Sequence, residues 1–401
     1  MRSTSRRLGV LFVPVLLAAG IQFAGAPASA AEGDVRYAPA STAVEGSWIV
    51  VLKDGTATRA ETASAARSLA GEYEGSLTHV YGSAVKGFAA KLSEAEAKSL
   101  AKDPAVAYVE QNARVRISET QPNATWGIDR IDQRDLPLST TYTYNTSASN
   151  VTAYIIDTGI RTSHADFGGR ASIGTDTVGG GQNGQDCNGH GTHVAGTVGG
   201  KNHGVAKGVK LVGVRVLDCN GSGTNAGVIA GVDWVTANAV KPAVANMSLG
   251  GGANTSLDNA VKRSIASGVT YAVAAGNGNF LGWPQNACNY SPARVPEAIT
   301  VGATDRNDRR GSFSNFGTCL DVFAPGVSVT SAWITNDTAT NTISGTSMAS
   351  PHAAGVAALY LASNPGAAPA QVRDALVNGA TSGKVQDPRT GSPNKLLYSL
   401  F

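Results

Sequence analysis

From about residue 119 onward, short apolar runs alternate with segments whose apolar residues recur at helical spacing. Strands are predicted at 154–157, 211–217, 244–248, 269–274 and 299–302, and helices at 227–239 and 257–267. Apolar strands that alternate with helices are typical of a parallel sheet covered on both faces. We therefore predict an α/β domain in which polar residues at the carboxyl ends of the strands form the site.

Residues 47–118 show a different pattern. Strands are predicted at 48–52, 85–92 and 106–110, with Phe88 pointing inward, and helices at 62–73 and from Ser93, where Glu96 completes a capping box. The order β-α-β-β-α-β is that of a ferredoxin-like α+β unit. The small and polar residues 31–46 predict a linker.

The first 30 residues are typical of a secretory signal. Arg2, Arg6 and Arg7 precede an apolar stretch at 8–19, and Ala28-Ser29-Ala30 is an A-x-A cleavage site. A retained anchor is the alternative, but the stretch is short for a membrane span. We expect a secreted protein with no membrane association after removal of the signal, divided into segments 1–30, 31–118 and 119–401.

Composition and charge limit the classes of function that this chain can have. Charged residues make up 15% of the chain against roughly 25% in average soluble proteins, and there are 48 glycines. This favours a tightly packed globular enzyme with many turns. The net charge of +3, without a basic cluster interleaved with aromatics, gives no support to nucleic-acid binding. The four cysteines of an exported protein predict disulfides, with three possible pairings.

Three short segments contain the residue types of nucleophilic catalysis: Asp157-Thr158-Gly159, His190-Gly191-Thr192-His193 and Gly345-Thr346-Ser347. A serine hydroxyl needs a base to take its proton, and an anionic group must orient that base. The order Asp, His, Ser differs from that of α/β-hydrolases and of chymotrypsin-like enzymes. A lipase-type esterase is disfavoured, because Ala349 replaces the second glycine of Gly-x-Ser-x-Gly.

This order and the residues of the three segments resemble those of the subtilisin family (subtilases), and within it the aqualysin-like enzymes of the proteinase K branch. The resemblance covers residues 47–401. It implies a subtilisin-like fold and a secreted serine endopeptidase of broad specificity that hydrolyses peptide bonds through an acyl-enzyme. Asp157 would orient the base His190, and Ser347 would be the nucleophile. The alternative is a catalytically inactive binding protein of the same fold.

Competing interpretations of these residues are weaker. Ser347 could be only an N-cap of the apolar helix that follows it, in which Pro351 is expected in the first turn. A His-x-x-His metalloprotease would need an acid inside the motif, and Gly191 and Thr192 supply none. We interpret His193 and His352 as structural.

The resemblance also implies a substrate cleft. Asn277 would donate its side-chain amide to the oxyanion, together with the backbone N–H of Ser347. The implied substrate-binding residues are Gly221, Ser222, Gly223, Ser248, Leu249, Gly250, Ala274 and Gly276. Small uncharged residues beside Asn277 predict a preference for apolar or aromatic side chains. In the alternative interpretation these segments are ordinary loops.

Disulfides and calcium sites are implied in the same way. The matching contexts pair Cys187 with Cys219 and Cys288 with Cys319. One calcium would be held by Asp321 and the carbonyls of Pro296 and Ala298, and a second by Asp129, Asp132 and Gln133. These ions would be structural, and no catalytic cofactor is expected.

Two departures from the family pattern are visible. Val194 stands where proteinase K has a thiol. The loop 278–286, with Phe280 and Trp283, looks longer than in relatives, and our hypothesis is that it borders the cleft and changes preference near the scissile bond.

Residues 47–118 resemble the inhibitory propeptide of subtilases, including Tyr108-Val109-Glu110, so that 31–118 would be a propeptide with its inhibitor and chaperone domain at about 47–118. It would assist folding of the peptidase, whose parallel sheet is expected to fold slowly. It would then occupy the cleft until self-cleavage near Ser118 and Glu119. The partners implied are protein and peptide substrates and the chain's own propeptide, and we expect a monomer.

Overall fold

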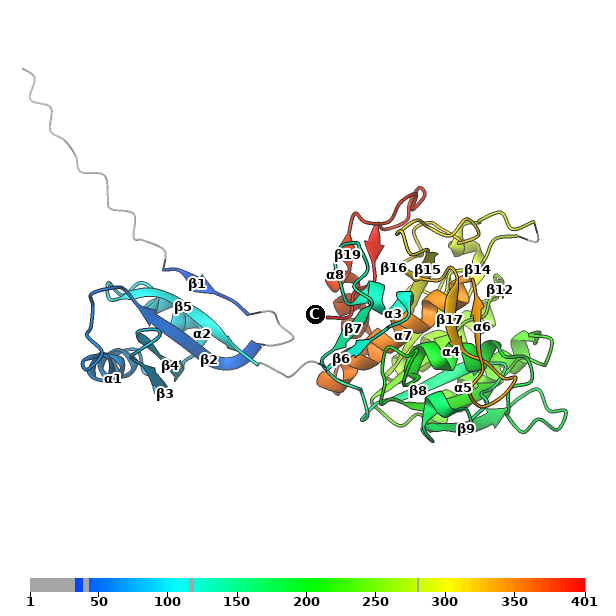
Figure 1. The fold of residues 1–401 in the computed structure, drawn as a ribbon, viewed down its shortest axis with the longest axis horizontal. Helices are drawn as coiled ribbons and strands as arrows, with labels where there is room; N and C mark the ends of the chain where they lie inside the picture. The colour runs from blue at the N-terminus through cyan, green and yellow to red at the C-terminus, as the bar shows by residue number, and fades with distance from the viewer. Residues whose placement is uncertain (1–32, 39–42, 115–118, 280, 401) are drawn as a thin grey trace, which may run out of the picture. The chain divides into compact units, whose positions relative to one another are not determined.

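The computed structural model describes residues 33–38, 43–114, 119–279 and 281–400. The chain divides into two compact units between residues 115 and 116, and both are drawn in Figure 1. The predicted signal at 1–30 and Ser118 lie outside the described residues. Within the part that is described, no helix is both long and apolar enough to cross a membrane.

The first unit is a five-stranded sheet with helices on one face. Its strands are β1 (Val35–Arg36), β2 (Ala43–Leu52), β3 (Ser76–Tyr81), β4 (Gly87–Lys91) and β5 (Val106–Ala113), in the order β1-β5-β2-β4-β3. Its helices are α1 (Thr62–Glu72) and α2 (Glu94–Leu100). Along β2, Trp48 and Val50 are buried in a core shared with both helices, whereas Ile49 and Val51 are half-buried. From β2 to β5 the elements follow the predicted ferredoxin-like order.

The predicted linker at 31–46 is wrong where the structure describes it. β1 lies inside this segment and pairs in parallel with β5, and β2 begins at Ala43 rather than near residue 48. Strand pairing uses backbone groups, so a polar segment at the edge of a sheet can pair without an apolar pattern. The guanidinium of Arg36 also lies 3.7 Å from the ring centroid of Tyr108.

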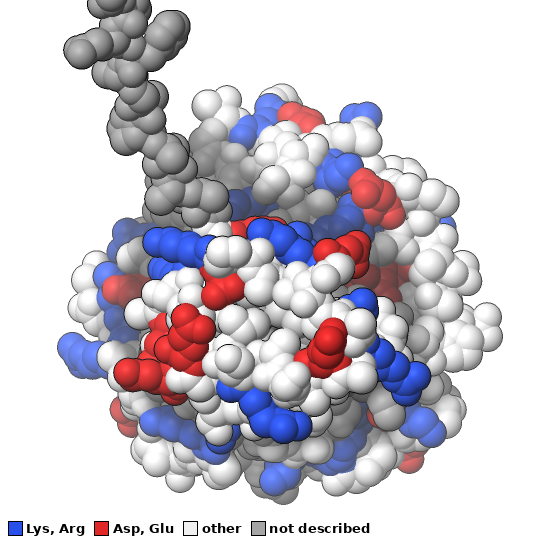
Figure 2. Space-filling model, turned by 90° about the vertical axis from the view of Figure 1, so that its left-hand side faces the viewer, with Lys and Arg blue, Asp and Glu red and all other residues white. Residues whose placement is uncertain are grey.

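The surface of the molecule seen in Figure 2 carries acidic and basic side chains mixed with uncharged ones. No extended patch of one sign is visible on the described part of that face.

The second unit contains a nine-stranded sheet, whose neighbouring strands are parallel except for the pair β19 and β20. Its order is β19-β20-β16-β15-β13-β11-β8-β10-β9. The strands are β8 (Thr152–Asp157), β9 (Ala171–Asp176), β10 (Lys210–Arg215), β11 (Ala243–Met247), β13 (Val269–Ala274), β15 (Ile299–Thr304), β16 (Val322–Pro325), β19 (Thr381–Ser382) and β20 (Lys395–Leu396). The predicted mainly parallel sheet is confirmed.

Helices cover both faces of this sheet (Figure 1). One core contains residues of α3 (Trp126–Ile131), α4 (His190–Gly199), α7 (Thr346–Ser363) and α8 (Pro369–Gly379). The other core contains residues of α5 (Asn225–Asn238) and α6 (Thr255–Ala266). Successive residues of β8 point into opposite cores, Ile155 into the first and Ile156 into the second. Such a strand is buried on both faces, which explains its apolar run at 153–156.

Among the described residues, three two-stranded sheets lie outside the large one, together with the short 3₁₀ helices η1 (Ala165–Phe167) and η2 (Ala287–Asn289). They pair β6 (Glu119–Pro122) with β7 (Thr141–Tyr144), β12 (Gly251–Gly252) with β14 (Tyr290–Ser291), and β17 (Val329–Ala332) with β18 (Thr340–Ile343). The hairpin of β17 and β18 packs on α4 and leads directly into α7.

The register of the large sheet brings the polar segments to one edge. Asp157 ends β8 opposite Arg215, the last residue of β10. Met247 ends β11 opposite Val273, next to the last residue of β13. Because carboxyl ends of parallel strands meet at the same edge, the loops that follow them lie together, as predicted.

Candidate active site

An acid and a base meet where β8 ends and α4 begins. The Nδ1 of His190 lies 2.7 Å from Oδ1 of Asp157, whose side chain is fully buried. The same oxygen accepts a hydrogen bond from the backbone N–H of Thr158 at 2.8 Å. A quarter of the His190 side chain remains exposed, so the imidazole is held on one side and open on the other.

The pKa of His190 is raised above its ordinary value of 6.5. Burial lowers this pKa, but the charge and hydrogen bond of Asp157, with the charge of Asp186, together outweigh burial. The carboxylate therefore stabilises the imidazolium, which is the role that an acid plays behind a general base.

Asp186 organises the segment around the base, and the sequence analysis missed it. Its Oδ1 accepts hydrogen bonds from the N–H groups of Asn188 and Gly189, and from the hydroxyl of Thr158, all at 2.9 Å. Its Oδ2 accepts from the N–H and hydroxyl of Thr192 in the first turn of α4. This carboxylate thus accepts from the N–H groups of Gly189 and Thr192 at the helix start. The N–H groups of His190 and Gly191 donate instead to the side chains of Asn188 and Thr158. A signal was present, since Asp186 lies four residues before His190.

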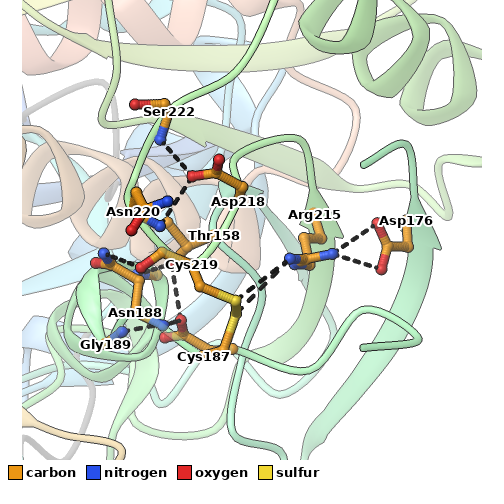
Figure 3. Close-up of a disulfide and its surroundings, with 12 residues drawn as sticks. Thr158, Asp176, Cys187, Asn188, Gly189, Arg215, Asp218, Cys219, Asn220 and Ser222 are labelled. Atoms are coloured by element: carbon orange, nitrogen blue, oxygen red, sulfur yellow. Dashed lines mark hydrogen bonds and ion pairs between the residues drawn. A yellow bond between two sulfur atoms is a disulfide. The ribbon is translucent and has the colours of Figure 1, made fainter. Parts of the chain in front are cut away.

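A disulfide joins the His190 segment to a loop after β10. Cys187 is bonded to Cys219, and Asn188 Nδ2 donates to the Cys219 carbonyl at 3.0 Å. Figure 3 shows the guanidinium of Arg215 between this disulfide and Asp176. The second disulfide joins Cys288 to Cys319. Both pairs are those that the resemblance implies.

Ser347 is the second residue of α7, and its Oγ donates to the carbonyl of Ser248 at 3.1 Å. Pro351 is not in the first turn as predicted, because α7 already begins at Thr346. A proline cannot donate to the carbonyl four residues earlier, which here belongs to Ser347. The hydroxyl of Ser248 donates to that carbonyl at 2.7 Å instead, and so fixes the backbone of Ser347.

Asn277 is oriented by the residue before the serine. Its Oδ1 accepts hydrogen bonds from the N–H of Thr346 at 2.8 Å and from its hydroxyl at 2.9 Å. Because the amide oxygen is held in this way, the Nδ2 donor is left available beside Ser347. A preorganised donor of this kind is what an oxyanion requires.

Two adjoining cavities form a cleft around these groups. The larger, of about 560 Å³, is lined by His190 and includes Gly221, Ser222, Gly223 and Ser248 in its wall. The smaller, of about 180 Å³, is lined by Ser347 and includes Ala274, Gly276 and Asn277. Both share Leu249, Gly250 and Gly251. All residues assigned to the cleft from the sequence therefore line it, and no charged side chain lines the smaller cavity.

The other histidines of the motifs are buried and bonded to backbone. His193 Nε2 lies 3.0 Å from the Val329 carbonyl, and burial lowers the pKa of His193 to about 3. His352 Nδ1 lies 2.8 Å from the Met348 carbonyl, and burial lowers the pKa of His352 to about 4. Among the described residues no group of three His, Cys, Asp or Glu side chains could hold a metal ion.

The two implied calcium sites differ in their fit. Asp321 accepts from the N–H of Thr300 and forms an ion pair with Arg373, whose positive charge opposes a cation at this carboxylate. At the other site, Oδ1 of Asp132 is buried without a hydrogen-bond partner among the described residues. The carboxylate of Asp129 accepts hydrogen bonds from the Ser139 hydroxyl and from the Thr140 N–H. An unpaired carboxylate oxygen beside a second carboxylate suits a hard cation.

The loop 278–286 is closed at its base by Asn315, whose Oδ1 accepts from the N–H groups of Gly278 and Gln285. Gly278 lines the smaller cavity. Trp283 is 68% exposed and lies in the wall of neither cavity, and Phe280 is outside the described residues. An effect of this loop on substrate preference remains a hypothesis.

Comparison with known proteins gives two family matches. Residues 148–394 match the model of the Subtilase family, and residues 47–118 match that of the peptidase inhibitor I9. An extracellular serine proteinase of Thermus sp. (strain Rt41A) is 59% identical over 80% of this chain and 77% of its own. Alkaline serine exoprotease A of Vibrio alginolyticus is 54% identical over 83% of this chain and 62% of its own.

One solved structure gives the same result for the fold. The crystal structure of a cold adapted subtilisin-like serine proteinase is 57% identical and superposes with a TM-score of 0.67, covering 70% of this chain and 99% of that one.

We predict that Asp186→Ala lowers the free energy of unfolding by about 2 kcal/mol or more, because it leaves several backbone donors at the start of α4 without an acceptor. Denaturant unfolding, measured in a Ser347→Ala background, tests this. Asp233→Ala, at an exposed position of α5, is the control and should change stability by less than about 0.5 kcal/mol. Equal stability of the two variants would contradict the role given to Asp186.

Proposed function

Because this chain belongs to the subtilase family of serine proteinases, we propose that it hydrolyses peptide bonds with Asp157, His190 and Ser347 as a catalytic triad. The observation that carries the proposal is the 2.7 Å contact between His190 and the buried Asp157, in a cleft that Ser347 also lines. The extracellular relative supports secretion. An inactive binding protein is not favoured, since each chemical role has a residue.

In the proposed reaction, His190 Nε2 takes the proton of Ser347 Oγ as that oxygen attacks the scissile carbonyl. Oγ must turn from the Ser248 carbonyl toward the imidazole for this step. Asp157 stabilises the imidazolium, and the Asn277 amide and the Ser347 N–H stabilise the oxyanion. The imidazolium then protonates the leaving amine, and water attacks the acyl-enzyme by the same route in reverse.

We propose that the substrate lies extended along the cleft. Backbone groups of Gly221–Gly223 and Ser248–Gly250 would pair with it as an added strand. The small cavity beside Asn277 has no charged residue in its wall, which supports an apolar or aromatic side chain on the acyl side of the scissile bond. We propose that the enzyme acts as a monomer on proteins and peptides.

The first unit is proposed to be an inhibitory propeptide that assists folding and is removed by self-cleavage. The I9 match at residues 47–118 supports this division, with a signal at 1–30 and the peptidase from residue 119. Residue Glu119 begins β6, and its carboxylate accepts from the Tyr144 hydroxyl at 2.6 Å.

Calcium is proposed as a structural ion at Asp132 and Asp129, where it would neutralise two carboxylates. Burial raises the pKa of Asp132 to about 6, so binding would need the proton to leave. The site at Asp321, Pro296 and Ala298 has less support because Arg373 already neutralises the carboxylate.

We predict that wild-type precursor, expressed in a protease-deficient host, yields a shorter chain beginning near residue 119. Ser347→Ala should leave the precursor uncut, because the nucleophile is absent. Ser344→Ala, an exposed serine three residues earlier, is the matched control and should mature normally. Intact mass and N-terminal sequencing measure the result, and full-length wild type would contradict self-cleavage.

We predict that kcat/KM for a peptide substrate rises with pH through a single ionisation above about pH 6.5. Only neutral imidazole accepts a proton, and the raised pKa of His190 moves the loss of activity to higher pH. Asp157→Asn removes the charge that raises this pKa, so the midpoint should fall and kcat should drop about 10⁴-fold. An unchanged midpoint in this variant would contradict the role of Asp157 in raising the pKa of His190.

We predict that calcium raises the melting temperature of the wild type relative to a chelator, and that Asp132→Asn removes most of this increase, because it removes one ligand charge. Asp233→Asn serves as the surface control. A full calcium response in Asp132→Asn would place the ion elsewhere.

A further inference from the structure

Trp333 packs against the residue that immediately precedes the base. Gly189 has a φ of +110°, and a Cβ placed on it would lie 2.6 Å from Cζ2 of the Trp333 indole. A side chain at Gly189 would therefore clash with the indole. A residue other than glycine would also be strained at this positive φ. The indole ring is the surface on which the turn into His190 rests.

The same hairpin contacts α4 beyond this turn. His193, one turn after His190, lies with its ring at 81° to that of Trp333 and 6.3 Å away. Its Nε2 meets the Val329 carbonyl of β17 at 3.0 Å. Because burial keeps His193 neutral, Nε2–H can donate to this carbonyl at any working pH. Farther along, Gly196 packs directly on Ser331 and Ala332.

The tip of the hairpin, residues 333–339, is also tied to the segment that follows Asp157. Asp337 Oδ1 accepts from Arg161 Nε at 2.7 Å and from the Ser163 hydroxyl at 2.6 Å. The Ala339 carbonyl lies 2.9 Å from His164 Nε2. The tip therefore connects the segment that follows Asp157 with the segment that contains His190.

The other end of the hairpin leads to the nucleophile. β18 ends at Ile343, and Gly345 N–H donates to the Gly326 carbonyl at 2.8 Å before α7 begins. One continuous element thus contacts the segments of all three triad residues.

We propose that Trp333 is a positioning residue for the general base, holding Gly189 so that His190 stays aligned between Asp157 and Ser347. This rests on the proposed triad. Trp333 lines neither described cavity of the cleft, so it acts on turnover and leaves substrate binding unchanged. A displacement of about 1 Å in a catalytic group can cost about 10²-fold in rate.

A matched control exists on the other face of the sheet. The ring of Trp234 in α5 lies 2.6 Å from where a Cβ of Gly174 in β9 would be, the same kind of contact as that of Trp333. Both tryptophans are partly exposed. Trp234→Ala removes a comparable contact from the fold without touching the base.

The test measures kcat and KM on a peptide p-nitroanilide for Trp333→Ala and Trp234→Ala, each also in a His190→Ala background. Every precursor is cut by immobilised wild-type enzyme, which is then removed, and Ser347→Ala reports any carried-over activity. We expect Trp333→Ala to lower kcat about 10²-fold with KM within twofold. Trp234→Ala should keep the wild-type kcat.

The double variant decides how the loss arises. Residues that act as one unit are non-additive, so Trp333→Ala should cause no further loss when His190 is already Ala. An equal loss in both backgrounds, or a kcat within twofold of wild type, overturns the proposal. Should Trp333→Ala fail to fold, Trp333→Leu, which fills the space without a flat ring, is judged by the same criteria. If His190→Ala alone keeps full activity, the triad is wrong; if only Trp333→Ala is silent, the triad stands and this inference fails.

Discussion

The contact between His190 and the buried carboxylate of Asp157 constrains most of the peptidase unit. It requires the end of a central strand and the start of a helix to meet within hydrogen-bond distance. A carboxylate buried at the sheet edge needs donors from its environment, and Thr158 and His190 both meet its Oδ1. The parallel sheet makes this possible because neighbouring strands end at one edge.

Each reactive group is oriented by a partner that satisfies a backbone or amide group. Asp186 accepts from N–H groups at the start of α4, and Thr346 donates to the side-chain oxygen of Asn277. Ser248 donates to the Ser347 carbonyl, to which Pro351 has no N–H to donate. In the proposed reaction these partners would reduce the reorganisation needed when charge develops in the transition state.

The disulfide between Cys187 and Cys219 and the hairpin of β17 and β18 hold the base segment from different directions. The disulfide connects it to a wall of the cleft, and the hairpin connects it to the acid loop and to the nucleophile. This arrangement places Asp157, His190 and Ser347 at the ends of regular elements, and in the proposed function it leaves the glycine-rich walls free to meet the substrate backbone.

The sequence alone predicted the fold class, the main strands and the three residues of the proposed triad, because these depend on local periodicity and on short motifs whose residues carry the chemistry. The apolar residues 154–156 indicate a strand because both faces of β8 are buried. The cleft and cysteine pairs followed from resemblance to a family. The structure alone showed β1, the helix position of Pro351, the ion pair of Asp321 with Arg373, the hydrogen bonds of Asp186 and the contact of Trp333 with Gly189. These depend on contacts between segments that are distant in sequence or on the geometry of a turn, and neither periodicity nor motif spacing encodes which groups meet there.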